Sequence, residues 1–352
     1  MANKKTLYLF IVLLAAVLVM SLYFAAKWLH TPINKPQANT VFHVPAGASV
    51  KAVANALFSE EVIDWPDIWL LYARYIENKK PIKVGEFQLT SVMTPAQVLQ
   101  KLQGTDVIQY QVTLVEGLRF QDYVLALSKH SKIQSILVGK TQAEQLALLN
   151  INVAHPEGWF FPDTYQFTAD TNDVDVLRIA HKKMKTVLNE AWQNKEKDLP
   201  YESAYEALIM ASIVEKETGA AHERKEIAGV FVRRLNKKMR LQTDPTVIYG
   251  LGDAYDGDIK RKHLKAYTPY NTYVIKGLPP TPIASPGKAA IEAALNPKAG
   301  SSLFFVGKGD GTHQFSDTLE AHNKAVREYQ INRRVKNYRS SPPVEKKEQA
   351  VP

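Results

Sequence analysis

Hydrophobic residues are unevenly distributed along the chain, and the longest apolar run lies near its start. This run begins at Thr6, ends at Ala26 and contains no charged residue. At about 1.5 Å of rise per residue, a helix over the run spans roughly 30 Å, the thickness of the hydrocarbon core of a membrane. Lys4 and Lys5 precede the run, and Trp28 follows it, where interfacial aromatic residues gather. The pattern predicts a single membrane-spanning helix.

A cleaved signal peptide is the competing interpretation of this run. The apolar region of a signal peptide is shorter, about 7–15 residues, and a small-residue cleavage site follows it. No clear site of that kind precedes Trp28. We therefore predict an uncleaved signal anchor, in which residues 1–28 form a cytoplasmic stub and the span. A polar linker with two prolines over residues 29–40 leads to the rest of the chain, which lies on the other side of the membrane.

Short periodic segments predict a small α/β module over residues 41–106. A strand pattern opens it, and Ser49 caps a helix whose apolar residues recur at helical spacing. A second helix starts at Pro66, and the alternating segment VGEFQLT predicts another strand. Thr94 and the proline after it cap a third helix, which ends at Gly104.

The region from 107 to 338 mixes both kinds of element, so the fold class is α+β. Its first segment, VIQYQVTLV, is rich in β-branched residues and predicts a strand. Helical patterns follow over residues 117–130, 142–149, 173–195, 207–219 and 223–239. Residues 240–243 predict a short strand. The segment LFFVGKGDGTHQFS predicts a hairpin with a Gly-Asp-Gly turn, and a helix over 318–333 comes next. The polar residues 339–352 predict a disordered tail.

The composition fits a folded chain and removes several chemistries. The chain has 352 residues, of which 45% are hydrophobic. There is no cysteine, which excludes disulfides, thiolate metal sites and cysteine nucleophiles. Lys and Arg number 44 against 35 Asp and Glu, a net charge of +9. This charge suits nucleic acid, an anionic membrane or an acidic polymer equally well, and it is also typical of a solvated surface.

One candidate for acid–base chemistry lies in the segment ALIMASIVEKETG. On a helix, Glu217 follows the apolar stripe of Met210, Ile213 and Val214, whereas Glu215 lies about 200° away around the axis. Burial and the negative end of the helix dipole both raise the pKa of a carboxyl in such a place. A glutamic acid with a pKa near 6–7 can donate a proton at neutral pH. The plainer interpretation is that both glutamates are exposed, as in many Glu-Lys-Glu runs.

Two later segments offer polar and aromatic side chains that suit sugars. In MRLQTDPTVIYG, Gln242, Asp244 and Tyr249 are candidates, although Asp244 before a proline is also an ordinary helix N-cap. The segment YTPYNTYVIKGLPPTPIASPG is a long loop stiffened by prolines, and long loops are often functional. A purely structural proline-rich loop is the alternative. The residues chosen here as candidates to position a substrate are Gln242, Asp244, Tyr270, Asn271 and Tyr273.

Other catalytic patterns fail on spacing. Ser285 and Lys288 have the S-x-x-K spacing, but neither S-D-N nor K-T-G accompanies them. The nucleophile elbow G-x-S-x-G, the zinc motif H-E-x-x-H and the glycine-rich nucleotide loops do not occur. The histidines show no ligand spacing. We therefore predict no metal and no cofactor.

Several motifs together resemble one known family. MASIVEKETG, MRLQTDPTVIYG, PYNTYVIKGLPPTPIASPG and LFFVGKGDGTHQFS, in this order, are similar to segments of the endolytic murein transglycosylases of the MltG/YceG-like family. LVEGLRFQDY, EGWFFPDTYQF and the single N-terminal anchor extend the resemblance over most of the chain. It implies a LysM-like module over residues 41–106 packed against a catalytic region over 107–338.

The resemblance also implies an activity and a place. The family's catalytic glutamate, the second Glu of its SIVEKE-type motif, corresponds to Glu217. The implied reaction cleaves the MurNAc-β-1,4-GlcNAc bond of nascent peptidoglycan without water and leaves a 1,6-anhydromuramyl end, which terminates glycan elongation. The implied location is the bacterial inner membrane, with a cytoplasmic N-terminus and a periplasmic catalytic domain. Peptidoglycan strands and peptidoglycan synthases become the expected partners, and nucleic acid does not. Hydrolytic muramidase activity and a non-catalytic peptidoglycan-binding scaffold are the alternatives.

Overall fold

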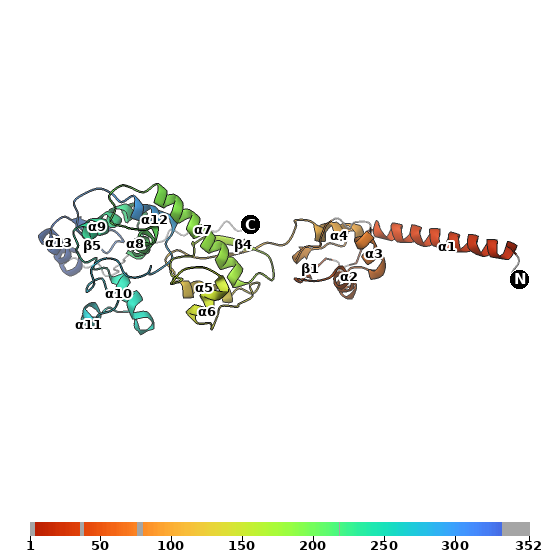
Figure 1. The fold of residues 1–352 in the computed structure, drawn as a ribbon, viewed down its shortest axis with the longest axis horizontal. Helices are drawn as coiled ribbons and strands as arrows, with labels where there is room; N and C mark the ends of the chain where they lie inside the picture. The colour runs from red at the N-terminus through yellow and green to blue at the C-terminus, as the bar shows by residue number, and fades with distance from the viewer. Residues whose placement is uncertain (1–3, 36–38, 76–79, 218, 333–352) are drawn as a thin grey trace. The chain divides into compact units, whose positions relative to one another are not determined.

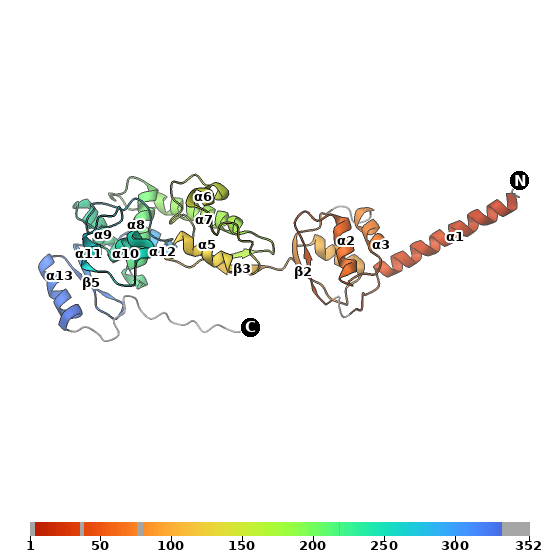
Figure 2. The same cartoon turned by 90° about the horizontal axis from the view of Figure 1, so that it is seen from below.

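The structure is a computed structural model, and it describes residues 4–35, 39–75, 80–217 and 219–332 (Figures 1 and 2). The predicted tail over 339–352 lies outside the described residues. The chain divides into two compact units. The first unit comprises residues 1–111, 132–134 and 166–171, and the second comprises 112–131, 135–165 and 172–352. Both helices and strands are present, which confirms the predicted mixture of the two, and the LysM-like character of the module stays a prediction.

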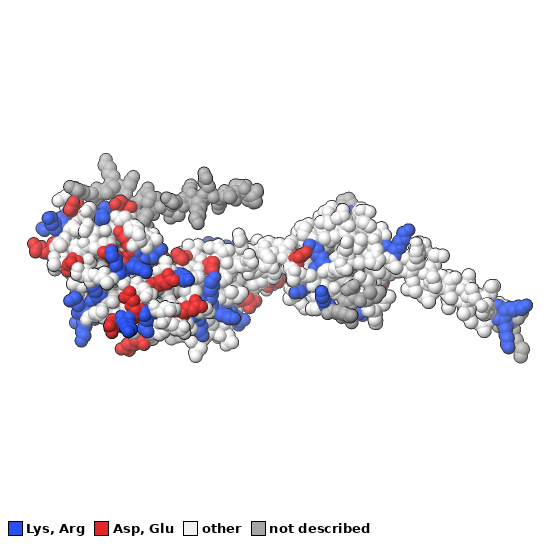
Figure 3. Space-filling model, turned by 90° about the horizontal axis from the view of Figure 1, so that it is seen from above, with Lys and Arg blue, Asp and Glu red and all other residues white. Residues whose placement is uncertain are grey.

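The first unit begins with α1, Lys4–Leu29, a helix of 26 residues. Its side chains are exposed over nearly all of its length because it packs against other elements only at its end. The helix is long and apolar enough to cross a membrane. The surface of α1 carries charge only near its ends in the view of Figure 3. The predicted N-terminal apolar helix is therefore confirmed, and its orientation in a membrane stays a prediction.

The rest of the first unit is a small module built on one antiparallel strand pair. Strand β1, Val41–Val44, pairs with β2, Gly85–Gln88. Three helices complete the module: α2, Val50–Ser59, α3, Pro66–Tyr75, and α4, Pro95–Gln103. Ser49 caps α2, and Thr94 forms a capping box with Gln97 at the start of α4, as their residue types predict. The core of the module surrounds Trp69, which is fully buried and donates its indole N–H to the Pro95 carbonyl at 2.9 Å.

Helices of the second unit surround one central helix. This helix, α8, covers Ala204–Glu217, and every residue from 207 to 214 is buried. It packs against α7, Asp173–Gln193, α9, Arg224–Asn236, α10, Asp244–Leu251, and α12, Lys288–Leu295. The sequence of a helix that is buried on all faces is apolar throughout and does not show an apolar stripe along one face. Charged side chains occur only at its two ends, with Glu206 in the first turn and Glu215, Lys216 and Glu217 in the last.

The remaining elements, from residue 110 onward, are short. Strand β3, Tyr110–Thr113, pairs with β4, Thr164–Phe167, and α5, Phe120–Ser128, and α6, Gln142–Leu149, lie between them in sequence. Further along lie η2, Ala221–Glu223, η3, Gly252–Ala254, and α11, Arg261–Lys265. The predicted hairpin is confirmed as β5, Phe304–Gly307, paired with β6, His313–Ser316. The helix after it, α13, Leu319–Val326, changes at Arg327 to a π-helical segment that ends at Asn332.

The predicted strand over residues 240–243 is wrong. Gln242 has a positive φ of 55°, which breaks an extended strand. The buried guanidinium of Arg234 also takes the carbonyls of Arg240 and Leu241, which a strand would offer to a neighbouring strand. The N-cap of α10 is Thr243 rather than Asp244, which is already the first helical residue.

Candidate active site

Glu217 is the last residue of α8 and stands where the buried helix meets the surface. Its side chain is half-buried, and the hydroxyl of Thr243 donates a hydrogen bond of 2.7 Å to its Oε2. Burial, together with the negative charge of Asp244, raises the pKa of Glu217 to about 7. The Thr243 hydroxyl and the Arg234 guanidinium act in the opposite direction. A carboxyl of this kind is protonated in a large share of molecules at neutral pH and can donate its proton.

A group of buried threonines fixes the segment that faces Glu217. Thr243, Thr246 and Thr272 are each at most 2% exposed. The Thr243 N–H donates to the Thr272 hydroxyl at 3.1 Å, and the hydroxyls of Thr246 and Thr272 lie 2.8 Å apart. The Gln242 N–H also donates to the Thr272 carbonyl at 3.2 Å. These bonds hold the start of α10 against the proline-rich loop, so that the Thr243 hydroxyl points at the Glu217 carboxyl.

Two predicted substrate residues meet beside Glu217. The Tyr273 hydroxyl donates to Asp244 Oδ1 at 2.7 Å, and Asp244 is exposed. Burial, followed by the negative charge of Asp244, raises the pKa of the Tyr273 phenol well above its usual value. Gln242 lies on the same segment as Asp244, and its side chain is exposed. Asp244 and Tyr273 therefore form a polar edge next to Glu217, and Gln242 lies two residues before Asp244.

The other two predicted residues have partners in the loop or just before it. Asn271 is 1% exposed, and its amide nitrogen donates to the carbonyls of His263 and Ala266 at 3.0 and 2.6 Å. Its amide oxygen accepts the Tyr273 N–H at 3.0 Å, so Asn271 fixes the backbone on which Tyr273 stands. The Tyr270 hydroxyl pairs with Thr281 at 2.9 Å. Direct sugar contacts of either side chain stay a prediction.

Arg234 is a residue of this site that the sequence did not indicate. It is 7% exposed, and its guanidinium donates to the carbonyls of Leu303 at 2.6 Å and Leu241 at 2.7 Å. It also lies over the Phe304 ring, 5.1 Å from its centroid. A buried arginine satisfied by carbonyls keeps its charge without a carboxylate partner. That charge favours ionisation of Glu217, while burial favours its neutral form.

Glu215, the alternative glutamate, has a different environment. Its Oε2 accepts the Gly287 N–H at 2.9 Å, and the Arg224 guanidinium lies 3.6 Å from its other oxygen. Burial raises its pKa, and the Gly287 hydrogen bond lowers it. Glu215 thus anchors the end of the proline-rich loop, whereas Glu217 faces Thr243 and Asp244.

A second buried carboxyl, Glu157, was also not anticipated. It is 4% exposed, accepts the Phe120 N–H at 2.9 Å and accepts the Tyr249 hydroxyl at 3.1 Å. Burial raises its pKa to about 7. Tyr249 in turn packs on the Tyr270 ring, with centroids 4.8 Å apart. Glu157 therefore supports the aromatic pair behind the site.

The raised pKa of Glu157 makes stability depend on pH in a defined direction. The folded state binds the proton more tightly than the unfolded chain, so this contribution is fully present below pH 4.5 and is lost as pH rises through about 7. A shift of this size corresponds to at most about 3 kcal/mol. We expect Glu157→Gln, which keeps both hydrogen-bond partners, to flatten the fall in melting temperature between pH 5 and pH 8. Glu190→Gln, at an exposed position of α7, should leave that fall unchanged; equal slopes for both variants would contradict the assignment.

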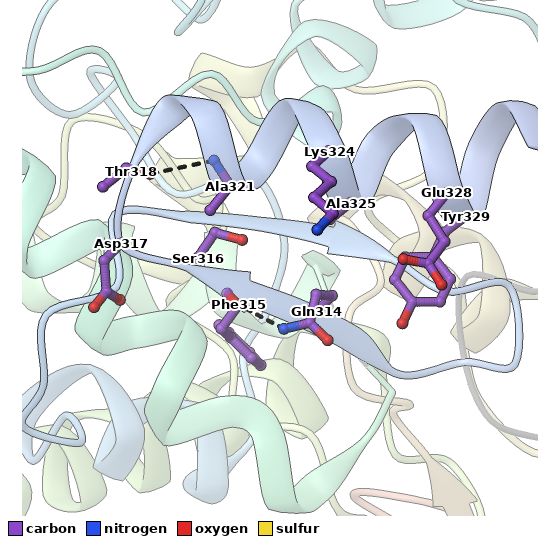
Figure 4. A pocket seen from close by; sticks show the side chains of 10 residues that line it. All are labelled: Gln314, Phe315, Ser316, Asp317, Thr318, Ala321, Lys324, Ala325, Glu328 and Tyr329. Carbon is purple, nitrogen blue, oxygen red and sulfur yellow. Dashed lines mark hydrogen bonds between the residues drawn. The ribbon is translucent and has the colours of Figure 1, made fainter.

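Two of the cavities in the second unit have nearly equal volumes. One, of about 460 Å³, lies beside the site and is lined in part by Arg119, Lys216, Tyr249 and Ile283. The other, of about 450 Å³, lies between β6 and α13 (Figure 4) and includes none of the predicted site residues. Within the described part of the chain, no group of three or more His, Asp or Glu side chains is placed to hold a metal ion. Glu217, with its raised pKa, is a group in this site that can serve in acid–base chemistry.

Comparisons with known proteins define the family. The model of the YceG-like family matches residues 42–328. An endolytic murein transglycosylase of Bacillus subtilis is 35% identical over 326 residues, which cover 86% of this chain and 88% of that protein. One of Streptococcus pneumoniae is 29% identical and covers 81% of this chain, which spans 57% of that longer protein. A crystal structure of a putative yceG-like protein from Listeria monocytogenes has a TM-score of 0.51 at 30% identity and covers 81% of this chain and 98% of its own.

The chain belongs to the YceG-like family, which confirms the resemblance found in its motifs.

Proposed function

We propose that this chain is a lytic transglycosylase that cleaves the β-1,4 bond between N-acetylmuramic acid and N-acetylglucosamine in peptidoglycan. The observation that carries the proposal is the Glu217 carboxyl, whose pKa is raised to about 7 at the open end of α8. The exposed polar groups of Gln242 and Asp244 beside it suit a sugar. The names of the related murein transglycosylases support the choice of substrate.

In the proposed reaction, Glu217 acts twice. Its carboxylic acid first protonates the glycosidic oxygen, and the bond from that oxygen to C1 of the muramyl residue breaks. The resulting carboxylate then takes the proton of the C6 hydroxyl, whose oxygen bonds to C1 and closes the 1,6-anhydro ring. Glu217 ends protonated, as it began, and no water is consumed. One carboxyl suffices because the nucleophile belongs to the substrate, whereas hydrolytic glycosidases use two.

The neighbouring residues have supporting roles in this proposal. The Thr243 hydroxyl orients the Glu217 carboxyl, and the charge of Asp244 helps to keep it protonated at rest. Tyr273 fixes Asp244 through their hydrogen bond. We assign sugar contacts to Gln242, Asp244 and Tyr273 at the polar edge. Asn271 and Tyr270 act on the substrate through the loop that they hold.

Asp244 also favours one competing function, a hydrolytic muramidase. It is an exposed carboxylate close enough to Glu217 to raise its pKa, and it provides the second carboxylate that hydrolysis requires. The two functions differ in their products. Hydrolysis adds water and leaves a reducing muramyl end, whereas transglycosylation leaves the anhydro end.

Product analysis distinguishes these functions. We expect the full chain, given purified glycan strands in water enriched in heavy oxygen, to release anhydromuramyl ends without the isotope in the mass spectrum. We also expect Asp244→Asn to reduce the rate by about tenfold or less, because it lowers the Glu217 pKa and keeps a polar side chain for the sugar contact. Labelled reducing ends, together with a loss of about a thousandfold or more in Asp244→Asn, would establish the muramidase instead.

The proposed setting follows from α1. A helix that crosses the inner membrane with its N-terminus in the cytoplasm would place the catalytic region in the periplasm, where nascent glycan strands are made. There the enzyme would terminate glycan elongation and act near peptidoglycan synthases. The module over residues 41–106 would then serve as a LysM-like neighbour of the catalytic region.

A further inference from the structure

An exposed apolar stripe runs along α3 in the first unit. Trp65, Ile68, Leu71 and Tyr75 follow one another at spacings of three and four, which places them on one helix face. Leu71 is 57% exposed and Tyr75 is 77% exposed. The core of the module is satisfied by other residues of α3, such as the fully buried Trp69. The stripe is therefore surplus to the packing of the module.

The stripe starts at the end of α1. The rings of Trp28 and Trp65 lie 5.3 Å apart, and Leu29 is buried in the core of the module. A groove of about 690 Å³ has Phe24 and Ala25 of α1 on one side and Trp65, Ile68 and the exposed Phe58 on the other. Figures 1 and 2 show α3 beside the end of α1.

Backbone hydrogen bonds hold the residues after α1 against the module. The N–H of Ile33 donates to the Met93 carbonyl at 2.9 Å, and the N–H of Asn34 donates to the Ser91 carbonyl at 2.8 Å. These bonds join the short segment that follows α1 to the turn before α4. The core of the module and these backbone hydrogen bonds thus hold the module at the end of α1. As a result, α3 keeps a defined position along the axis of α1.

The position of α3 along the axis of α1 coincides with the edge of the proposed membrane span. Phe24 and Ala25 lie within one helical turn of Lys27, the first charged residue after the apolar run. In a membrane, the last turn of a span lies at the boundary between hydrocarbon and headgroups, which Trp and Tyr side chains prefer. Groups that share a groove with Phe24 and Ala25 lie at the same depth.

We propose that the apolar stripe of α3, together with Phe58, is a lipid-contacting surface that lies in the interface of the bilayer crossed by α1. Its occupant is the headgroup–acyl boundary of that bilayer, as for interfacial helices with an apolar face. The inference rests on the proposed membrane span. It adds a second attachment to the anchor, so that the module lies on the membrane instead of swinging from a flexible tether.

Site-directed spin labelling tests this surface, because the chain has no cysteine of its own. We would reconstitute the full chain in vesicles of phosphatidylethanolamine and phosphatidylglycerol and label Leu71→Cys or Tyr75→Cys. We expect collisions with oxygen to be enhanced and collisions with a water-soluble nickel chelate to fall several-fold relative to Val84→Cys. Val84 is an apolar control that is 40% exposed and directly precedes β2 in sequence. Figure 2 shows β2 on the side of the module away from α1.

A label at Leu14→Cys separates this proposal from the one on which it rests. Lipid-like accessibility at Leu14 with water-like accessibility at Leu71 and Tyr75 would overturn the surface and leave the span intact. Water-like accessibility at Leu14 would overturn the span and the surface together. Strong spin–spin broadening between Leu71 labels, undiminished by dilution into excess lipid, would assign the stripe to a second copy of the chain and also overturn the proposal.

Discussion

Replacing Glu217 by Gln is expected to reduce glycan cleavage by about a thousandfold or more, because the amide has no acidic proton to transfer to the glycosidic oxygen. The Thr243 hydroxyl can still donate to the amide oxygen of the new side chain, so the local geometry is preserved. The loss should therefore appear in kcat with little change in KM. The rate of release of new chain ends from purified strands, followed by mass spectrometry, measures it.

The pH dependence of the unsubstituted enzyme gives a second measure of the same group. Glu217 must be protonated to start the reaction, and burial holds its pKa near 7. Activity is therefore expected to fall as pH rises through about 7. Ionisation of the folded state is also unfavourable at this position, so Glu217→Gln should melt no earlier than the parent at pH 8. A lower melting temperature at that pH would mean that the variant loses activity by unfolding.

Glu215→Gln is the matched control for this experiment. The two glutamates lie on the same turn of α8, and burial raises the pKa of both. Because Glu215 contacts Gly287 and Arg224 instead of Thr243, its substitution should weaken the loop and leave the high-pH limb of activity in place. Full activity in Glu217→Gln together with an inactive Glu215→Gln would show that Glu215, on the other face of the helix, carries the reaction instead of Glu217.

Local signals in the sequence predict the elements well where the interactions that form them are local. Ser49 and Thr94 cap α2 and α4 through side-chain bonds to backbone three residues away, and the hairpin turn lies between its own strands. The strand expected over 240–243 fails for the opposite reason. Its carbonyls are taken by Arg234, a residue of the preceding helix whose contacts no local pattern reveals.

The candidate site shows the same difference between features set by local interactions and features set by distant contacts. The apolar stripe that singled out Glu217 assumed a helix with one buried face, but α8 is buried on all faces over residues 207–214. The partners of the two glutamates, rather than the stripe, distinguish them. Thr243 and Glu157 gained their importance only from contacts with residues far away in sequence, such as Thr272 and Tyr249. The spacing of residues along the chain does not predict those contacts.

Arg234→Met is expected to lower the free energy of unfolding of the second unit by several kcal/mol, on the order of 3, because it leaves buried carbonyls without donors. The carbonyls of Leu303 and Leu241 lose their bonds, and the hairpin loses its tie to the segment that carries Thr243. Arg233→Met is the matched control, since the half-buried Arg233 donates to carbonyls of Ser302 and Lys298 near the surface, where water can replace it. Denaturant unfolding followed by circular dichroism should show the larger loss of stability in Arg234→Met.

Removal of the Arg234 charge should also raise the Glu217 pKa. The high-pH limb of the activity profile should then move to higher pH in the fraction of Arg234→Met that stays folded. Equal losses in the two variants, with an unmoved limb, would mean that Arg234 acts on the hairpin alone and has no influence on the Glu217 carboxyl.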